Sequence, residues 1–178
     1  MAILPIRLFG DPVLTTPAEP VTTFDAELRR LVRNLDQTLS DQRGSGLAAP
    51  QVGIGLRVFA FHDEDVSGHL VNPVLHFPDT EEQDGPEGCL SIPGFYFDTK
   101  RRMNVVANGY TADGDPVQVV GSGNLARCLQ HETDHLDGVL FIDRMDQPTR
   151  KQAMKAIREA NWDGDVKFSP HRMNDRIF

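Results

Sequence analysis

The sequence has 178 residues, 39% of them hydrophobic and 25% charged, and its formal net charge is −8. This length and balance are typical of one soluble globular domain, and the acidic charge argues against a general nucleic-acid binder. Two cysteines are too few for a disulfide scaffold, the first residues carry no signal-peptide pattern, and no apolar run reaches the length of a membrane span. We therefore expect a cytoplasmic protein whose residues 1–178 form a single domain with free thiols.

The first half of the chain predicts a helix followed by a pair of strands. Four prolines make the first twenty residues extended and rich in turns. Residues 26–40 carry leucines at helical spacing and predict an amphipathic helix. Residues 56–61 and 69–77 predict two strands that pair with each other, with a bend or bulge at Pro73.

The second half begins with connections and a hairpin. Residues 80–85 are acidic and predict a surface connection, and Pro93 with Gly94 indicates a turn. Residues 104–110 and 116–120 are separated by a short segment that contains an Asp-Gly dipeptide, which is typical of a β-hairpin.

The end of the chain predicts two helices. One begins at a cap formed by Ser122 or Asn124 and is closed by Gly138 in the left-handed conformation. The other covers residues 148–162. Residues 163–178 show little periodicity, and we expect them to form a loosely packed tail.

The helix that ends at Gly138 carries the most informative motif. His131 and His135 lie four residues apart, and therefore on one helix face, and Glu132 directly follows the first histidine. Two imidazoles at this spacing can bind one metal ion, and the adjacent carboxylate can act on a water bound to that ion. The motif predicts a metal site.

At about 100° per residue, the side chains of this helix divide into a buried face and a solvated face. The buried face carries Leu125, Leu129 and Leu136. The two histidines lie at the edge of this buried face, where an unpaired polar group is costly and a metal ion would provide the missing partner. The solvated face is predicted to carry Ala126, Arg127, Gln130, Asp134 and Asp137.

A tetrahedral site needs a third protein ligand. The extended pattern His-Glu-x-x-His-x-x-Gly-x-x-His would place it at position 141, where this chain has Phe141. Cys128 shares the helix face, but its Cα is expected about 10 Å from that of His135, which favours packing over ligation. The remaining thiol is Cys89, in the segment Glu87-Gly88-Cys89-Leu90-Ser91, whose glycine lets the backbone approach a site.

A glycine-rich segment, Gly44-Ser45-Gly46-Leu47-Ala48-Ala49-Pro50-Gln51, also suits a backbone that another group approaches closely. It lacks the lysine of a phosphate-binding loop, and its glycine spacing does not match the dinucleotide fingerprint. By itself, the pattern is equally consistent with a tight loop that enters a strand.

These three segments, at residues 44–51, 87–91 and 130–135, resemble in order and content the three motifs of the peptide deformylases, metallo-amidases that remove the formyl group from nascent bacterial proteins. The resemblance covers most of the chain and implies a single catalytic domain. It implies that one metal ion is bound by Cys89, His131 and His135. It also implies Fe²⁺ in the cell, with Zn²⁺, Ni²⁺ or Co²⁺ able to substitute.

The same resemblance implies a role for each remaining motif residue. Glu132 would be the general base and then the general acid for attack by a metal-bound water, while Gln51 and the backbone N–H of Leu90 would bind the developing oxyanion. Gly44 and Gly46 would bind the substrate backbone as an added strand. Further substrate contacts would come from Ser45, Glu87, Gly88 and Cys128. Ser45 departs from the family pattern, because relatives often carry a larger or apolar residue there, and Asn124 departs where they often carry a large apolar one.

The expected fold is α+β, with small antiparallel or mixed sheets wrapped around the central metal-binding helix and the N-terminal and C-terminal helices packed outside. The expected partner is a formyl-methionyl nascent peptide, and no membrane or specific nucleic-acid sequence is expected. A contact with the ribosome is one interpretation of the basic last helix, and an ordinary solvated face is the alternative. That helix carries Arg150, Lys151, Lys155 and Arg158.

Two other functions share part of this pattern. A zinc endopeptidase also uses His-Glu-x-x-His and would take Glu159 as its third ligand, so that a Cys89 variant would keep its metal. A structural metal site would need four protein ligands, and the sequence offers no obvious fourth.

Overall fold

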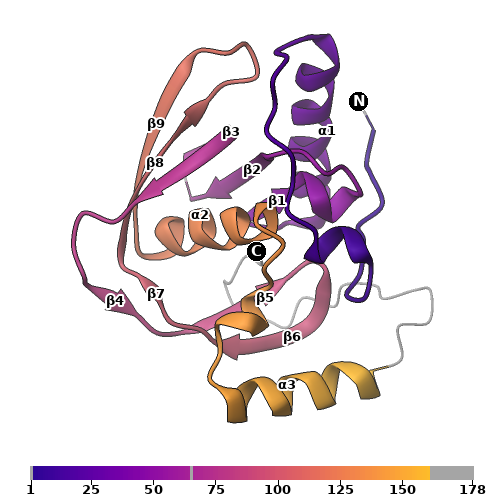
Figure 1. Ribbon diagram of the computed structural model, residues 1–178, viewed down its shortest axis with the longest axis vertical. Helices are drawn as coiled ribbons and strands as arrows, with labels where there is room; N and C mark the ends of the chain where they lie inside the picture. Colours follow the sequence, from indigo (N-terminus) through magenta and orange to yellow (C-terminus); the bar gives the residue numbers. More distant parts are fainter. Residues whose placement is uncertain (1, 65, 161–178) are drawn as a thin grey trace.

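The computed structural model describes residues 2–64 and 66–160 (Figure 1). The predicted tail, residues 163–178, therefore lies outside the described residues. The α-helices of the described chain are α1 (Ala26–Gln42), α2 (Gly123–Leu136) and α3 (Gln147–Glu159). Short 3-10 helices are η1 (Pro12–Thr15), η2 (Ala49–Val52) and η3 (Phe141–Arg144). The strands are β1 (Gly46–Ala48), β2 (Val58–Asp63), β3 (Val66–His76), β4 (Glu82–Gln83), β5 (Pro86–Cys89), β6 (Ile92–Asp98), β7 (Arg101–Arg102), β8 (Asn104–Tyr110) and β9 (Pro116–Ser122).

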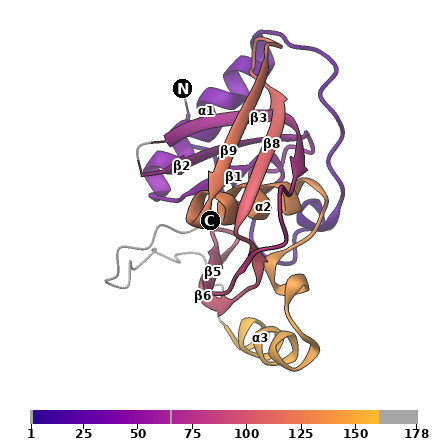
Figure 2. The same cartoon turned by 90° about the vertical axis from the view of Figure 1, so that its left-hand side faces the viewer.

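The strands form one large sheet and two small ones. The large sheet has the order β1-β2-β3-β8-β9, and the small sheets pair β4 with β7 and β5 with β6. All of these pairs are antiparallel. Helix α2 lies near the middle of the molecule, with α1 above it and α3 at the lower end (Figure 1). Figure 2 is turned to face β8 and β9 and shows α2 running behind these strands. The predicted α+β fold around a central helix is confirmed.

Alternation along β2 explains why helices cover both faces of the large sheet. Val58 and Ala60 belong to a core cluster with the leucines of α1, whereas Phe59 and Phe61 belong to a cluster with α2. Successive side chains of a strand point to opposite faces, so one short strand supplies both cores. A third cluster joins α3 to β6 and η3 and includes Ile92, Phe141, Ala153 and Ile157.

Most of the predicted elements are confirmed. Helix α1 begins after Asp25, whose side chain accepts hydrogen bonds from two backbone N–H groups of its first turn, and it extends two residues beyond the predicted end. The strands β2 and β3 pair as predicted, although β2 lies two residues later than the predicted 56–61 and β3 begins three residues before the predicted 69. The register between β3 and β8 shifts between Val71 and Val74, around the predicted bulge at Pro73. The β8–β9 hairpin closes through Gly114 at φ +90°.

Two details of the expected connections differ. The tight turn lies at Leu90–Ser91, between β5 and β6, whereas Pro93 and Gly94 lie inside β6. Gly94 has φ +84° and accompanies a register shift between the two strands, so this dipeptide bends a strand without reversing the chain. Within the predicted surface connection, Glu82–Gln83 pairs with Arg101–Arg102.

The helices at the end of the chain match their predicted positions. Ser122 is the N-cap residue of α2, although its side chain makes no capping hydrogen bond, and Gly138 lies beyond the C-cap at φ +71° as predicted. Helix α3 starts after Asp146, which accepts a hydrogen bond from the Thr149 backbone. The helix ends at Glu159, because its C-cap residue Ala160 is extended, so it stops short of the predicted end at residue 162, which itself lies outside the described residues. Along the part of the chain described here, no helix combines the length and apolar character needed to cross a bilayer.

The extended N-terminal segment bridges two of the motif segments. The backbone N–H of Arg7 donates to the carbonyl of Gln51 at 2.7 Å, and that of Phe9 donates to the carbonyl of Ser91 at 2.8 Å. The segment then returns to α2, where Ala18 donates to the carbonyl of Leu136 at 2.8 Å. The N-terminal segment, which includes η1, thus contacts η2, the β5–β6 turn and the end of α2.

Replacement of Gly138 by alanine is expected to destabilise the fold. A Cβ there would lie 2.9 Å from the carbonyl carbon of Thr15, and the backbone is left-handed. The left-handed conformation costs an L-residue about 1–2 kcal/mol, and overpacking adds roughly 1–3 kcal/mol. Gly123→Ala is the matched control, because Gly123 has φ +57° but no heavy atom of the described residues within 4 Å of its Cβ position. Thermal unfolding should show a larger loss for Gly138→Ala; equal losses would contradict the close approach to Thr15.

Candidate metal centre

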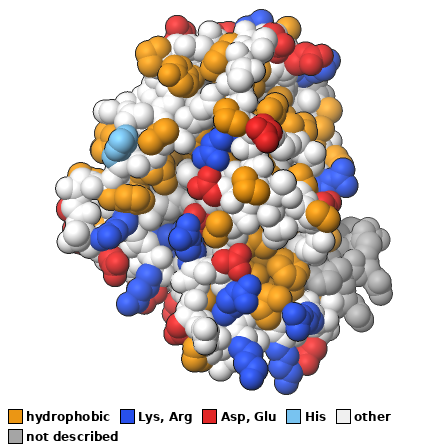
Figure 3. All heavy atoms as spheres, in the orientation of Figure 1, with side chains coloured by type: hydrophobic (Ala, Val, Ile, Leu, Met, Phe, Trp, Pro, Cys, Tyr) orange, Lys and Arg blue, Asp and Glu red, His pale blue; other side chains and the backbone are white. Residues whose placement is uncertain are grey.

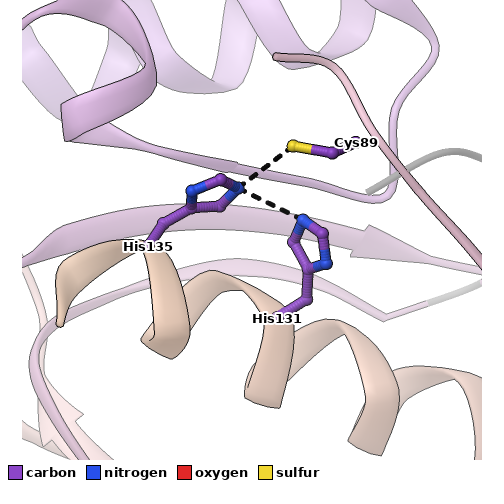
Figure 4. A group of neighbouring side chains, drawn as sticks. All are labelled: Cys89, His131 and His135. Carbon is purple, nitrogen blue, oxygen red and sulfur yellow. Dashed lines mark hydrogen bonds between the residues drawn. The ribbon is translucent and has the colours of Figure 1, made fainter. Parts of the chain in front are cut away.

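Three side chains from two elements converge in the core. His131 and His135 project from one face of α2 toward Cys89, the last residue of β5 (Figure 4). Nε2 of His135 lies 3.2 Å from Sγ of Cys89 and 3.2 Å from Nε2 of His131. The three ligand atoms all lie within 4.8 Å of one another, and each residue is at most 1% exposed.

This arrangement fits a transition-metal ion. Bond lengths of about 2.0–2.1 Å to nitrogen and 2.3 Å to sulfur place tetrahedral ligand atoms roughly 3.3–3.7 Å apart, close to the two short distances seen here. One thiolate and two imidazoles are donors that suit zinc, iron, cobalt or nickel better than magnesium or calcium. Three protein ligands leave a fourth position for water or substrate, which distinguishes a catalytic site from a structural one.

Burial shapes the protonation of these ligands. It raises the pKa of the Cys89 thiol to about 12, although the Ser91 N–H, 3.4 Å from Sγ, acts in the opposite direction. Burial, together with the neighbouring His131, lowers the pKa of His135 well below its usual value and keeps its ring neutral. A neutral imidazole is the form that binds metal, and a cation at the site would favour the thiolate of Cys89.

A buried carboxylate, that of Glu87, contacts the ring nitrogen of His131 that points away from Cys89 and His135. Nδ1 of His131 lies 2.7 Å from Oε1 of Glu87, which is on β5 two residues before Cys89. Arg101 donates to both carboxylate oxygens at 2.6 and 3.0 Å, and Arg127 donates to Oε2 at 2.8 Å. Burial opposes ionisation, but the hydrogen bonds from His131 and Arg101 lower the pKa of Glu87 well below its usual value. Because a carboxylate only accepts, Nδ1 of His131 carries the proton and Nε2 is left to face Cys89 and His135.

The ion pairs continue outward from Glu87. Arg101 donates to Asp134 at 2.6 Å, and Asp134 also accepts from Arg144 at 2.6 Å. Arg127 donates further to the backbone carbonyl of Thr99 at 2.7 Å. The side chains of Arg101 and Asp134 are at most 8% exposed, whereas that of Arg144 is 49% exposed. The network therefore runs from a predicted metal ligand to the surface.

This network corrects the predicted solvated face of α2. Apart from Asp137, the residues assigned to that face are buried, namely Ala126, Arg127, Gln130 and Asp134. Polar side chains can be buried when every charge is paired, and here the partners come from β5, β7 and the segment after α2. Hydropathy alone could not reveal this, because the partners are distant in sequence.

Gln51 lies beside Cys89 of the candidate metal site. Its Oε1 accepts a hydrogen bond from the Ala48 N–H at 2.7 Å, which fixes the orientation of the amide. Its Nε2 then lies 3.6 Å from Sγ of Cys89 and 3.3 Å from Oγ of Ser91. Leu90, at the turn between these two residues, is 3% exposed. The structure thus brings both predicted oxyanion-binding residues next to Cys89.

The carboxylate of Glu132 is fully buried at this centre. It is 0% exposed, and within residues 2–64 and 66–160 neither carboxylate oxygen has a hydrogen-bond partner. Burial, and next the negative charge of Glu87, raise the pKa of Glu132 well above its usual value. Two carboxylates near one centre are therefore tuned in opposite directions, Glu87 toward the charged form and Glu132 toward the neutral form.

The predicted substrate-binding residues lie on three parts of the chain near the centre: the segment that leads into β1, strand β5 and helix α2. Gly44 and Ser45 precede β1, an edge strand of the large sheet, and both are buried. Gly88 packs against Tyr96, whose ring carbon would lie 2.7 Å from an added Cβ. Cys128 is fully buried in the core cluster of α2, and its thiol donates to the Ser45 carbonyl at 3.3 Å. The expectation that Cys128 packs is confirmed.

The third ligand expected of a zinc endopeptidase is not at this site. Glu159 lies near the end of α3 with its side chain 67% exposed and 3.9 Å from Lys155. Among the described residues, Cys89 is the third metal-binding side chain that joins the two histidines. Sequence reasoning missed Arg101, which shares its guanidinium between Glu87 and Asp134, because a single arginine carries no spacing signal.

Replacement of Glu87 by glutamine should weaken both the fold and the metal site. It would leave Arg101 and Arg127 without their shared anion, and breaking a buried pair typically costs about 3–5 kcal/mol. Loss of a carboxylate behind a ligand histidine typically lowers metal affinity by about 10–100-fold. Thermal unfolding and a chelator competition titration would measure these changes.

In the control Asp113→Asn, which removes the exposed pair with Arg29, stability should change by about 0–1 kcal/mol. Parental stability and affinity in Glu87→Gln would show that the network is dispensable.

Known proteins are similar to this chain in both sequence and architecture. Residues 3–151 match the model of the polypeptide deformylase family. A peptide deformylase of Acidothermus cellulolyticus is 60% identical over 174 residues, covering 96% of this chain and 96% of its own. The solved peptide deformylase of Thermus thermophilus matches with a TM-score of 0.83 and 37% identity, over 88% of this chain and 93% of that one. That of Synechococcus elongatus, in complex with actinonin, gives 0.81 and 40% over 88% and 87%. The chain belongs to the polypeptide deformylase family.

Proposed function

We propose that this protein removes the N-formyl group from the terminal formylmethionine of newly synthesised proteins and releases formate. The observation that carries the proposal is the buried Cys89–His131–His135 group in a chain of this family. Beside it lies the buried carboxylate of Glu132, which has no hydrogen-bond partner among the described residues. The donor set supports one ion per chain, and we propose Fe²⁺ in the cell with Zn²⁺, Ni²⁺ or Co²⁺ able to replace it. When bound, the ion would polarise the formyl carbonyl and acidify a water molecule.

Glu132 would move the proton in this reaction. As water attacks the formyl carbon, the carboxylate takes a proton from it, and it returns that proton to the departing amine. Both oxygens are available for this task, because neither is engaged by another described residue. A raised pKa suits a group that must alternate between base and acid near neutral pH. Positioned general acid–base groups typically contribute about 10²- to 10⁴-fold in rate.

Gln51 and Leu90 would stabilise the negative charge that develops on the formyl oxygen. The Gln51 amide nitrogen already lies next to the ligand sulfur, with its orientation fixed by the Ala48 N–H. A donor held in place before the reaction costs little reorganisation, and removing one such donor typically lowers the rate by about 10²- to 10³-fold.

The substrate peptide would bind along β1. This strand is paired on one side with β2 and forms an edge of the large sheet, so its other side can accept an extended peptide as an added strand. Gly44 and Gly46 would provide backbone groups, and Ser45 and Gly88 would contact the substrate nearby. Cys128 would act through packing beneath Ser45, whose carbonyl its thiol contacts. For Glu87 we propose the positioning of His131 in place of a direct substrate contact, because its carboxylate is engaged by His131 and two arginines.

The decisive test is formate release from a short formyl-methionyl peptide, using oxygen-free protein loaded with Fe²⁺. Glu132→Gln should keep its metal and lose about 10²-fold or more in kcat, because the proton carrier is removed. Glu159→Gln is the matched control and should behave like the parent, since Glu159 lies exposed on α3. Cys89→Ala should lose its metal, which an endopeptidase ligated through Glu159 would not. No formate release from a parent protein that holds one metal would refute the proposed reaction.

We further infer that the protein acts in the cytoplasm, close to the ribosome, where its substrate emerges. Helix α3 exposes the side chains of Arg150, Lys151, Lys155 and Arg158. Lys and Arg side chains gather at the lower end of the molecule (Figure 3), where α3 lies in Figure 1. Such a cluster on a chain of net charge −8 supports contact with the phosphates of ribosomal RNA.

Charge reversal on α3 would test this contact. Lys151→Glu with Arg158→Glu should lower co-sedimentation with ribosomes by roughly 10-fold or more, and the binding that remains should depend less on salt. Formate release from a free peptide should stay unchanged, because these side chains lie on α3 and not among the residues of the metal centre. The same reversal of Arg30 and Arg33, which are exposed on α1, serves as the control. Unchanged binding in the α3 variant would remove the ribosome from the proposal.

A further inference from the structure

The carboxylate of Glu132 lies directly against the backbone of β1 at Gly46. An ideal Cβ built on Gly46 would overlap Oε1 of Glu132 and would lie 2.6 Å from its Cγ and Cδ. Non-bonded carbon atoms normally stay about 3.5–4.0 Å apart. The carboxylate thus occupies the space that any side chain at position 46 would need.

The backbone conformation of Gly46 does not itself require glycine. Gly46 is absent from the glycines with positive φ, unlike Gly138 or Gly114, so its conformation is open to other residues. Its place in β1, paired with Phe61 of β2, is that of an ordinary strand residue. What excludes a side chain here is therefore the neighbouring carboxylate and not the backbone.

If a side chain were added, the carboxylate and not the strand would have to move. β1 is fixed by its antiparallel pairing with β2, and the next two residues, Leu47 and Ala48, are 0% exposed in two different core clusters. The Glu132 carboxylate, in contrast, has no hydrogen-bond partner among the described residues. Only packing sets its place.

We infer that Gly46 is a positioning residue for Glu132, because the missing side chain is what lets the carboxylate lie against β1 beside the metal-binding histidines. The catalytic consequence rests on the proposed role of Glu132 as proton carrier. The strand proposed to bind the substrate peptide would then also set where the general base stands. A methyl group at position 46 would push the carboxylate away from its working position, and position 46 is not among the metal-binding side chains.

Crystal structures of the metal-loaded Gly46→Ala and parent proteins test the geometric part independently of any activity. The carboxylate of Glu132 should be displaced by about 1 Å or more, while the β1–β2 register and the three ligand atoms stay in place. Gly55→Ala is the matched control, because Gly55 is exposed and no heavy atom in the described part of the chain lies within 4 Å of its Cβ position. An unmoved carboxylate, with β1 shifted instead, would overturn the inference.

Kinetics with a formyl-methionyl peptide test the catalytic part. Gly46→Ala should lower kcat by about 10²-fold or more, keep one metal per chain, and change KM by less than about threefold. A merely structural role would lower stability and metal content instead. Glu132→Asp, whose carboxylate is one methylene shorter, should make the loss caused by Gly46→Ala at least about 10-fold smaller. Equal losses in both backgrounds, or full activity in Gly46→Ala, would overturn the positioning role.

Two further outcomes also test the inference. If Gly46→Ala does not fold, Glu132→Ala in the same chain should restore folding and metal binding, because it removes the overlapping group; failure to restore them would overturn the inference. If the parent releases no formate, the proposed reaction fails, yet the displacement of Glu132 in the crystal structure still supports or overturns the geometric inference.

Discussion

A single buried anion holds the metal centre together. The Glu87 carboxylate accepts hydrogen bonds from Arg101 of β7 and Arg127 of α2, and it faces Nδ1 of His131. A charge buried this deeply is tolerated only when it is paired and fully hydrogen-bonded. Because Glu87 precedes Cys89 by two residues on β5, the contacts that neutralise the carboxylate also hold the thiol against the histidines of α2. The interactions that make burial of the Glu87 charge possible are thus the same ones that assemble the site.

The centre uses two carboxylates whose surroundings differ in kind. Glu87 is surrounded by donors, which lower its pKa and keep it charged, and it faces Nδ1 of His131. Glu132 is surrounded by packing atoms and by the negative charge of Glu87, which favour its neutral form. When the surroundings of two acids shift their pKa values in opposite directions, one acid suits a fixed electrostatic role and the other suits proton transfer. The positions of Glu87, on a strand, and Glu132, on a helix, follow from the pairing of β5 with β6 and from the burial of α2.

The sequence predicted the features that depend on residues close together in the chain. Spacing placed His131 and His135 on one helix face, and the resemblance to known motifs placed Cys89 with them, as the structure does. The helices and the β8–β9 hairpin also followed from periodicity and turn residues. The buried polar face of α2 could not be predicted, because Arg127 and Asp134 look solvated until Glu87 and Arg101 are folded against them. The steric dependence between Gly46 and Glu132 was equally hidden, since it joins residues 86 positions apart.

The bridging N-terminal segment has a consequence for the order of folding. Phe9 meets Ser91, Arg7 meets Gln51, and Glu87 meets His131, so the contacts around the centre link distant parts of the chain. Contacts of long range cost loop-closure entropy before they are repaid, and therefore tend to form late. A chain that has been synthesised only as far as β9 has Cys89 but neither histidine. The site therefore cannot form on a growing chain until α2, which carries both histidines, has been synthesised.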